Sequence, residues 1–230
     1  MSGDGTTAGD GGTSRRAAGP DAGAGAPPVQ VVVATTNPGK LAEIRAILAA
    51  DHLDVDLTTM AEHGIAPPVE DGDTFEANAL IKARACVQAT GIAAIADDSG
   101  LEVDALGGEP GVFSARYAGE PGDDAANNAK LVAALADVPA AKRTARFVCA
   151  AALVTPDGGE QVVRGTMEGC IVDEPRGSHG FGYDPHFVSE EIGDGRTNAE
   201  LTPAEKDAIS HRGAAFRALV PAIRRLLGHG

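Results

Sequence analysis

The first part of the chain places a short apolar run before an amphipathic segment, the pattern of a strand followed by a helix. Residues 29–34 form a β-branched run of the length of a buried strand, and the polar residues 35–40 follow it. Leu41, Ile44 and Leu48 then recur at the i, i+3, i+7 spacing of one helical face. The pattern predicts a strand, a polar loop and a helix in that order.

A second helix is expected to begin at Asp73, whose side chain can cap its first turn. Glu76 stands three residues further on, as in a capping box. The helix should then run through the alanine-rich residues 78–89, and Gly91 marks its end.

The apolar residues 92–96 predict a short strand that meets two acids, Asp97 and Asp98, and leaves through a turn at residues 99–100. Ligands of open α/β sheets collect at the carboxyl ends of strands, so the acids indicate a metal or general-base site. A plain turn is the alternative, because Asp and Ser favour turns through local hydrogen bonds. Successive strand side chains point to opposite faces, so only one of the two acids should face a pocket.

The second half of the chain predicts two strands between two helical regions. A helix is expected over residues 123–136. Residues 145–154 and 161–164 predict two strands, and the turn at residues 156–159 makes that pair antiparallel.

A last helical region begins with a strong start signal at Thr202. Pro203 occupies the first helical position and Glu205 the third. Four apolar residues mark the buried face of the terminal helix: Phe216, Leu219, Ile223 and Leu227. Pro221 should kink or interrupt it. Together the elements predict an α/β domain with a mixed central sheet and flanking helices.

Composition limits the domain and its partners. Residues 1–28 carry almost no large apolar side chains and are expected to be a disordered tail, which leaves residues 29–230 as a single domain. The formal net charge of -14 argues against a sequence-independent nucleic-acid binder, although it does not exclude a small anionic ligand.

The cysteines and the apolar runs indicate a soluble, cytoplasmic protein. Cys86, Cys149 and Cys170 are odd in number and set in apolar surroundings, so they are interpreted as small buried hydrophobes in a reducing compartment. No apolar run approaches the roughly 20 residues of a membrane span, so no membrane partner is expected.

Two polar segments are candidate sites for a phosphate and its metal ion. Residues 35–40 place backbone amides, hydroxyls and Lys40 at the start of a helix, an arrangement that attracts anions; an ordinary strand-to-helix turn is the alternative. The acidic residues 70–73 suit Mg²⁺, which prefers oxygen ligands, although a solvated acidic loop is the commoner outcome for such a cluster.

Two further segments are candidates for recognition of a base. Residues 178–185 hold one of the two tyrosines of the chain, and Phe181 or Tyr183 can stack on a base while Asp184 accepts hydrogen bonds from its edge. The alternative is that these aromatics fill the core. Lys206 and Ser210 are four residues apart on one helical face if the helix runs that far, and they precede the potential donors His211 and Arg212; alternatively, these are ordinary helix-surface residues.

In this order the motifs resemble the inosine triphosphate pyrophosphatase family, also called the Ham1-like family. The resemblance spans residues 29–227. It rests on six segments: 34–40, 72–75, 96–106, 110–117, 180–185 and 205–213.

The resemblance implies two lobes around a cleft, a homodimer, and hydrolysis of ITP, dITP or XTP to the monophosphate and pyrophosphate with Mg²⁺. Glu70 and Asp98 match the metal-site acids of the family, and Asp98 also matches the proton acceptor for the attacking water. The residues that match substrate contacts are Thr35, Thr36, Asn37, Pro38, Gly39, Lys40, Ser99, Phe181, Gly182, Tyr183, Asp184, Lys206, His211 and Arg212.

A pocket can distinguish a 6-oxo purine from adenine by the hydrogen bonds that it forms with the base. His211 and Arg212 are candidate donors to the 6-oxo group, and Asp184 is a candidate acceptor for the ring N–H. The chain departs from the family at Ala77, where family members commonly carry Glu directly before the helix Asn; here the nearby acid is Glu76.

Two other functions are weighed against this one. A Maf-like pyrimidine nucleotide pyrophosphatase shares the architecture, but the segments 181–184 and 210–212 argue against it. A non-catalytic nucleotide-binding module would keep Lys40 and the aromatic loop, yet it has no need for both Glu70 and Asp98.

Overall fold

A six-stranded mixed sheet forms the centre of the protein in the computed structural model, which describes residues 28–228. The predicted tail therefore lies, apart from Pro28, outside the described residues. The strands are β1 (Val29–Val33), β2 (Val55–Thr59), β3 (Ala94–Val103), β4 (Thr144–Val154), β5 (Glu160–Ile171) and β6 (Phe187–Ser189). Their order is β2-β1-β3-β4-β5-β6, with β1 parallel to β2 and β3 and the remaining pairs antiparallel. The predicted mixed sheet is confirmed.

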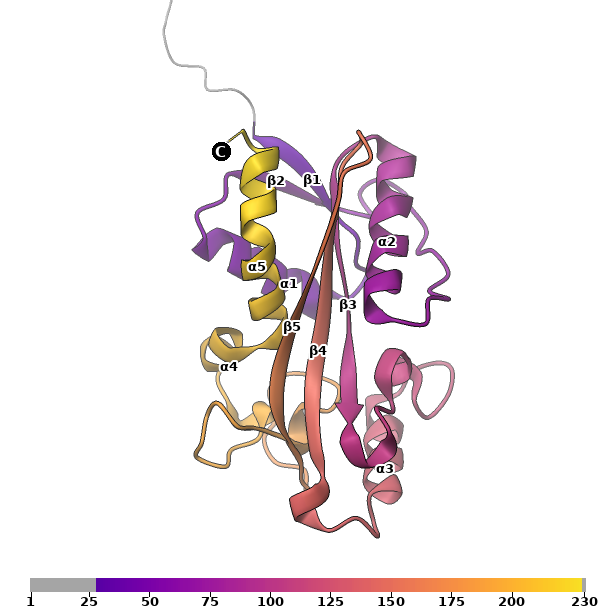
Figure 1. The fold of residues 1–230 in the computed structure, drawn as a ribbon, viewed down its shortest axis with the longest axis vertical. Coiled ribbons are helices and arrows are strands. Elements are labelled where there is room, and N and C mark those ends of the chain that lie inside the picture. Colours follow the sequence, from indigo (N-terminus) through magenta and orange to yellow (C-terminus); the bar gives the residue numbers. More distant parts are fainter. Residues whose placement is uncertain (1–27, 229–230) are drawn as a thin grey trace, which may run out of the picture.

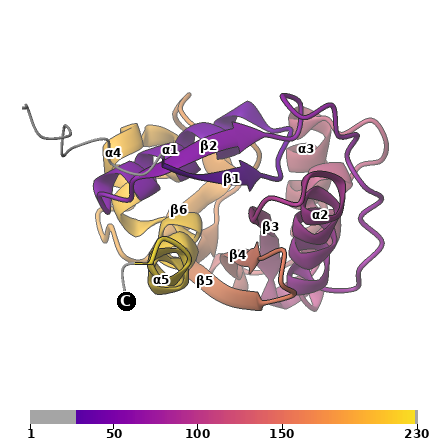
Figure 2. The ribbon, with the colours of Figure 1, turned by 90° about the horizontal axis from the view of Figure 1, so that it is seen from above.

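Five α-helices flank this sheet (Figure 1). They are α1 (Pro38–Ala50), α2 (Phe75–Thr90), α3 (Asp124–Ala134), α4 (Pro203–Ile209) and α5 (His211–Leu226). Seen from above, α5 and α2 lie on opposite sides of β3 and β4 (Figure 2). Among residues 28–228, every helix is too short or too polar to cross a bilayer.

The predicted turn at residues 99–100 is wrong, because β3 continues through it to Val103. Each residue of β3 pairs with β4 in one unbroken antiparallel ladder. Gly100 serves a close approach instead of a turn: a Cβ there would lie 2.4 Å from the Ser114 hydroxyl and 2.6 Å from the Gly111 carbonyl. Both paired acids are therefore inside a strand.

The predicted strand at residues 161–164 is only the first part of β5. Gly165 and Gly169 interrupt its apolar pattern, and this hides the rest of the strand in the sequence. At Gly165 the reason is packing against α5, because a Cβ would lie 2.3 Å from the His211 carbonyl oxygen. β2 was not predicted; it is a short, half-buried edge strand in which Val55 and Leu57 alternate with the exposed Asp56.

Three hydrophobic clusters divide the molecule into two lobes. In the first lobe, α1 and α5 pack on one face of the sheet and α2 packs on the other. The second lobe is built at the far ends of β3, β4 and β5, where α3 supplies Leu131 and Leu135. This lobe occupies the lower part of Figure 1.

Two helices start elsewhere than predicted. α1 begins at Pro38, within the polar loop predicted over residues 35–40. α2 also differs from its prediction. Its cap is Thr74, whose hydroxyl accepts the Ala77 N–H at 3.1 Å, and not Asp73. The side chain of Glu76 instead pairs with Arg164 on β5. α3 lies within the range predicted for it, and Asp123 caps it by accepting the N–H groups of Ala125 and Ala126.

The C-terminal helical region consists of two helices and not one. The capping box of α4 forms between Thr202 and Glu205 as predicted. α4 ends at Ile209, and Ser210 caps α5 by accepting the Gly213 N–H at 2.9 Å, so Lys206 and Ser210 do not share one helical face. α5 runs through Pro221 without an interruption.

Candidate active site

A cavity of about 360 Å³ brings together residues from both lobes. Almost all sequence-predicted site residues line it: Thr35, Thr36, Asn37, Lys40, Glu70, Asp98, Ser99, Phe181, Gly182, Tyr183, Asp184, Lys206, His211 and Arg212. Pro38 and Gly39, in the first turn of α1, lie outside its lining. The motifs are up to 177 positions apart in the sequence and meet at one place.

The paired acids face opposite sides of β3, as strand alternation requires. Asp98 lines the cavity, is 8% exposed and lies against α2. Asp97 is 1% exposed and points toward α1 and α5. Only Asp98 is therefore placed to meet a substrate.

Two side chains of α2 hold Asp98. The Asn78 amide donates to Asp98 Oδ2 at 3.1 Å, and the Lys82 ammonium lies 3.3 Å from Asp98 Oδ1. Lys82 also pairs with Glu70 at 2.7 Å, so its nitrogen lies between the two carboxylates. Burial opposes a charge on Lys82, but Asp98, Asp97 and Glu70 outweigh it and raise the pKa of Lys82 above its usual value.

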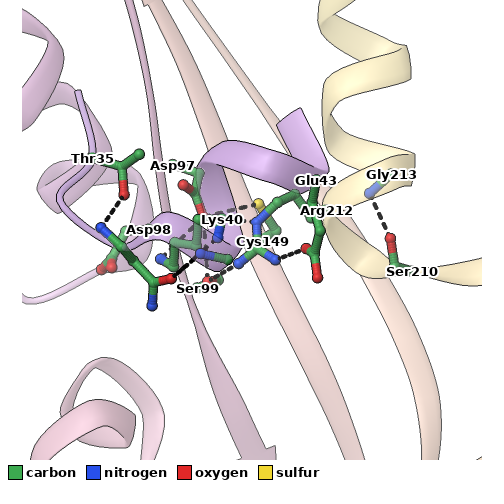
Figure 3. A network of polar contacts seen from close by, with 12 residues as sticks. Thr35, Lys40, Glu43, Asp97, Asp98, Ser99, Cys149, Ser210, Arg212 and Gly213 are labelled. Carbon is green, nitrogen blue, oxygen red and sulfur yellow. Dashed lines mark hydrogen bonds and ion pairs between the residues drawn. The ribbon is translucent and has the colours of Figure 1, made fainter. Parts of the chain in front are cut away.

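Asp97 is the centre of a buried network of charges behind the cavity wall. Lys40 Nζ lies 3.1 Å from Asp97 Oδ2 and Arg212 Nε lies 3.2 Å from the same oxygen. Figure 3 shows Lys40 and Arg212 converging on Asp97 while Glu43 approaches Arg212 from α1. Burial disfavours the Asp97 carboxylate, yet these two cations hold its pKa well below the usual range.

Arg212 joins three elements, α5, α1 and β3, through its three nitrogens. Besides the contact with Asp97, Nη1 binds Glu43 on α1 and Nη2 donates to Ser99 Oγ on β3 at 2.9 Å. The side chain is 1% exposed although it lines the cavity. The guanidinium thus fixes the start of α5 to α1 and β3.

The loop before α1 presents mainly side chains to the cavity. Asn37 caps α1, and its Oδ1 accepts the N–H groups of Gly39 at 2.9 Å and Lys40 at 3.1 Å. Thr35 Oγ1 accepts the Asn37 N–H at 3.2 Å. The amides expected to bind an anion are therefore engaged within the loop, and Lys40 with the hydroxyls of Thr35 and Thr36 faces the cavity.

At the other end of the cavity, Asp184 organises the aromatic loop. Its Oδ2 accepts the Phe181 N–H at 2.9 Å and pairs with the Lys206 ammonium at 2.7 Å. Asn198 donates to its Oδ1 at 3.2 Å. Lys206 Nζ also lies 4.9 Å from the centre of the Phe181 ring, a cation–π distance.

The two aromatics of this loop differ in role. Phe181 is 39% exposed at the cavity and is available for stacking. Tyr183 is 4% exposed and donates its hydroxyl to the Ser114 carbonyl at 2.8 Å, so it mainly fills the core.

The α3 helix holds the same loop at one residue, Gly182. Asp124 Oδ2 accepts the Gly182 N–H at 2.8 Å, and Asn128 donates to the Gly182 carbonyl at 2.9 Å. Gly182 has a φ of 61°, a conformation that side chains disfavour.

His211 enters the cavity wall as a buried, neutral ring. It stacks on Phe147 with 5.0 Å between ring centres, and its Nδ1 has no hydrogen-bond partner within residues 28–228. Burial, reinforced by the charges of Arg212 and Lys206, lowers the pKa of His211 well below its usual value.

Four site residues were missed in the sequence: Glu43, Asn78, Lys82 and Asp124. Asn78 and Lys82 did leave a signal, since they are one helical turn apart on the face that carries the buried Ala79 and Ala83. A polar pair on an apolar face must have buried partners. Glu43 and Asp124 left no such signal in the sequence, because their partners come from distant segments.

Among residues 28–228 there is no group of three or more His, Cys, Asp or Glu side chains that could hold a metal ion. Glu70 and Asp98 are the carboxylates that the cavity brings toward one cation, Lys82. The cysteines are free, with Cys86 and Cys149 buried and Cys170 partly buried.

Most of the chain is similar in sequence to known proteins. The model of the Ham1 family matches residues 31–222. The dITP/XTP pyrophosphatase of Streptomyces avermitilis is 54% identical over 200 residues, which cover 86% of this chain and 99% of the relative.

Two solved structures agree in fold. The nucleoside-triphosphatase / dITP/XTP pyrophosphatase of Mycobacterium abscessus is 52% identical, with a TM-score of 0.70 and coverage of 85% of this chain and 100% of that one. A HAM1 protein from Coxiella burnetii is 41% identical, with a TM-score of 0.78 and coverage of 86% and 99%.

Proposed function

The chain belongs to the Ham1 family, and we propose on this basis that it hydrolyses dITP, ITP and XTP to the monophosphate and pyrophosphate. Removal of these non-canonical purine nucleotides from the nucleotide pool is the cellular role that such an activity serves. The observation that carries the proposal is that motifs spread from Thr35 to Arg212 line one cavity with an oriented carboxylate, Asp98.

The triphosphate is assigned to the end of the cavity formed by α1 and β3. Lys40 supplies a cation whose side chain is 15% exposed, and Thr35, Thr36 and Ser99 supply hydroxyls. Asp97 orients Lys40 from behind. A charge-assisted contact of this kind favours a phosphate oxygen over a neutral group.

Glu70 and Asp98 fit a magnesium ion carried by the substrate. Both line the cavity, both carry oxygen donors, and both already contact one cation, the Lys82 ammonium. Mg²⁺ commonly takes only one or two protein carboxylates and completes its shell with water and phosphate. When bound, it would supply positive charge to the phosphate oxygens.

The hydrolytic step needs little covalent help from the protein. Water attacks the α-phosphorus, Asp98 accepts the proton of that water, and the bond from the α-phosphorus to the bridging oxygen breaks to release pyrophosphate. Lys40 neutralises charge on the phosphates during this step. Asn78 and Lys82 hold the Asp98 carboxylate in place for this proton transfer, at 3.1 Å and 3.3 Å from its two oxygens.

The base is assigned to the end formed by the aromatic loop and the start of α5. Phe181 offers a ring for stacking, and Asp184 lies beside it as an acceptor for a ring N–H. His211 and Arg212 are assigned to the 6-oxo edge, with His211 as a neutral donor. A 6-amino group would place a donor against these donors, so adenine is rejected.

A panel of nucleoside triphosphates tests the function by release of pyrophosphate. We expect dITP, ITP and XTP to exceed ATP and dATP in kcat/KM by about 100-fold or more, since an unpaired buried donor discriminates strongly. Equal turnover of ITP and ATP would contradict the specificity. Preferential hydrolysis of pyrimidine triphosphates would favour a Maf-like activity, and binding without hydrolysis would favour a nucleotide-binding module.

Asp98→Asn tests the catalytic assignment in the same assay. Loss of the proton acceptor should lower kcat by about 1,000-fold, in the range for a general base. Asp104→Asn is the control, because Asp104 follows the same strand but binds Arg146 outside the cavity. A wild-type rate for Asp98→Asn would remove Asp98 from the mechanism.

The family resemblance also supports a homodimer and a cytoplasmic location. Light scattering on the eluting protein should give about twice the mass of 23.2 kDa. A mass of one chain at micromolar concentration would contradict the dimer.

A further inference from the structure

Asn78 is a buried side chain whose two polar atoms are both engaged. It is 2% exposed. Its Nδ2 donates to Asp98 Oδ2 at 3.1 Å, and its Oδ1 accepts the Gly72 N–H at 2.9 Å. These partners lie on β3 and on the loop before α2, so one amide links three segments.

The partners fix which way round the amide lies. The Gly72 N–H can only donate, so it requires the amide oxygen, whereas the ionised Asp98 can only accept and requires the amide nitrogen. A reversed amide would lose both hydrogen bonds inside a buried site. Asn78 therefore has a single satisfied orientation.

Asn78 and Lys82 divide the two oxygens of Asp98 between them. Asn78 serves Oδ2 and Lys82 serves Oδ1, from positions one helical turn apart. Lys82 is shared with Glu70, and its charge can also be drawn to a phosphate. The neutral Asn78 amide nitrogen is not shared with a second carboxylate. Of the two side chains, Asn78 therefore holds Asp98 more constantly than Lys82 does.

The loop before α2 comes so close to Asn78 that only glycine fits there. A Cβ at Gly72 would lie 2.7 Å from Asn78 Oδ1 and 2.8 Å from the Ala77 Cβ. The loop also carries Glu70, whose carboxylate reaches Lys82 at 2.7 Å. The hydrogen bond from Gly72 thus ties the segment of Glu70 to the amide that orients Asp98.

From this geometry we infer that Asn78 is a positioning residue for hydrolysis. Its amide holds the Asp98 carboxylate in place and also holds the loop that carries Glu70 next to Asp98. The inference rests on the proposed function. Asn78 does not itself line the cavity, so it acts through Asp98 and contacts no substrate. Its loss should affect the chemical step more than binding.

Steady-state kinetics of Asn78→Asp with dITP provide the first test. The substitution preserves the shape and the acceptor for Gly72, but it puts a second carboxylate where Asp98 needs a donor. We expect kcat to fall by about 100-fold, the cost of a misplaced catalytic group, and KM to change by less than about threefold. If Asn78 only fills space, this isosteric variant keeps the wild-type kcat, and that result would overturn the inference.

Asn127→Asp is the matched control. Asn127 is also 2% exposed on a helix, and it donates to the Ala115 carbonyl while accepting the Ala118 N–H. The same change therefore disrupts one buried hydrogen bond away from Asp98. We expect a lower melting temperature with a kcat within about twofold of wild type. A kcat loss equal to that of Asn78→Asp would attribute the defect to general destabilisation.

Gly72→Ala gives an independent route to the same amide and remains informative if Asn78→Asp folds poorly. The added Cβ must displace Asn78 Oδ1, so kcat should fall by about tenfold. In a double variant with Asn78→Ala, Gly72→Ala should cost much less than it does alone, because the amide is already absent. Fully additive losses would overturn the inference.

The wild-type enzyme separates this inference from the proposed function. A wild type that releases no pyrophosphate from dITP or XTP refutes the function. An active wild type whose rate is insensitive to Asn78→Asp and Gly72→Ala refutes only the role of Asn78. Calorimetric binding of a non-hydrolysable dITP analogue without metal should give similar affinities for wild type and Asn78→Asp, as expected when binding is unaffected.

Discussion

At the scale of single residues, the site depends on which buried side chains carry a charge and which remain neutral. Lys40 and Asp97 share one ion pair, Lys82 lies between two carboxylates, and His211 next to them remains neutral. A neutral imidazole is a directional donor, whereas a charged ring would add to the cations beside it. The burial of His211 therefore suits the proposed role in base recognition, and it lowers stability in acid.

His211 makes a specific contribution to the pH dependence of stability. In the unfolded chain a histidine binds its proton near pH 6.5, but in the folded protein the pKa of His211 is well below that value. Below about pH 6.5 the unfolded chain takes up a proton that the folded protein does not. The free energy of unfolding should thus fall by about 1.4 kcal/mol between pH 7.5 and 5.5 through this group alone.

Urea unfolding of wild type and His211→Gln at these two pH values measures the effect. The wild type should lose about 1.4 kcal/mol more than the variant. His179→Gln is the control, because His179 is solvent-exposed and should leave the wild-type pH dependence in place. The same loss in wild type and His211→Gln would show that His211 is charged in the fold.

At the scale of elements, α3 belongs to the second lobe but controls a loop of the active site. Near the start of this helix, Asp124 accepts the Gly182 N–H and Asn128 donates to the Gly182 carbonyl. Phe181, the exposed aromatic, is the neighbouring residue. The position of the stacking ring therefore depends on a helix that carries no catalytic group.

Asp124→Ala should weaken substrate binding while leaving the chemical step intact. Without its acceptor the Gly182 N–H is released, and we expect KM for dITP to rise by about tenfold with kcat within about twofold of wild type. Asp123→Ala is the matched control, because it removes the cap of α3 without touching Gly182. Equal KM increases in both variants would indicate a general effect of the helix end.

The elements also explain how much the sequence could predict. The start of α4 and the end of α2 follow from local signals, the Thr202 capping box and Gly91, and both agree with the structure. The course of β3 does not, because the Ser-Gly pair that resembles a turn is a close contact with a segment eleven or more residues away. Local patterns cannot show that kind of partner.

The site residues also fall into those that the sequence could predict and those that it could not. Almost all of the predicted site residues line the cavity, and strand alternation correctly separates Asp98 from Asp97. Glu43 was expected only to lie off the apolar face of its helix, yet it pairs with Arg212 and lies 3.8 Å from Lys206. Those two cations follow it by more than 160 positions, and only the fold brings them together.

At the scale of the whole molecule, β1 is the first strand of the described residues, and we propose that the domain begins there. The Streptomyces avermitilis relative is covered over 99% of its length by an alignment that takes in 86% of this chain. Removal of residues 1–27 should therefore keep kcat/KM for dITP within about twofold of wild type. The same assay on the full-length and shortened chains measures it, and a large loss would give the tail a role in activity.

The charges that complete the site come from the two extremes of the domain. Lys40 and Glu43 are placed near its start, whereas Lys206 and Arg212 are placed near its end. During synthesis, the ribosome therefore produces residues 35–40, Glu43 and Asp97 long before Lys206 and Arg212. These two cations are the partners of Glu43 and Asp97. In the nascent chain, Asp97 lacks its partner Arg212 until α5 has left the exit tunnel. Enzymatic activity should consequently appear only after α5 has left the tunnel and has packed against α1 and β3.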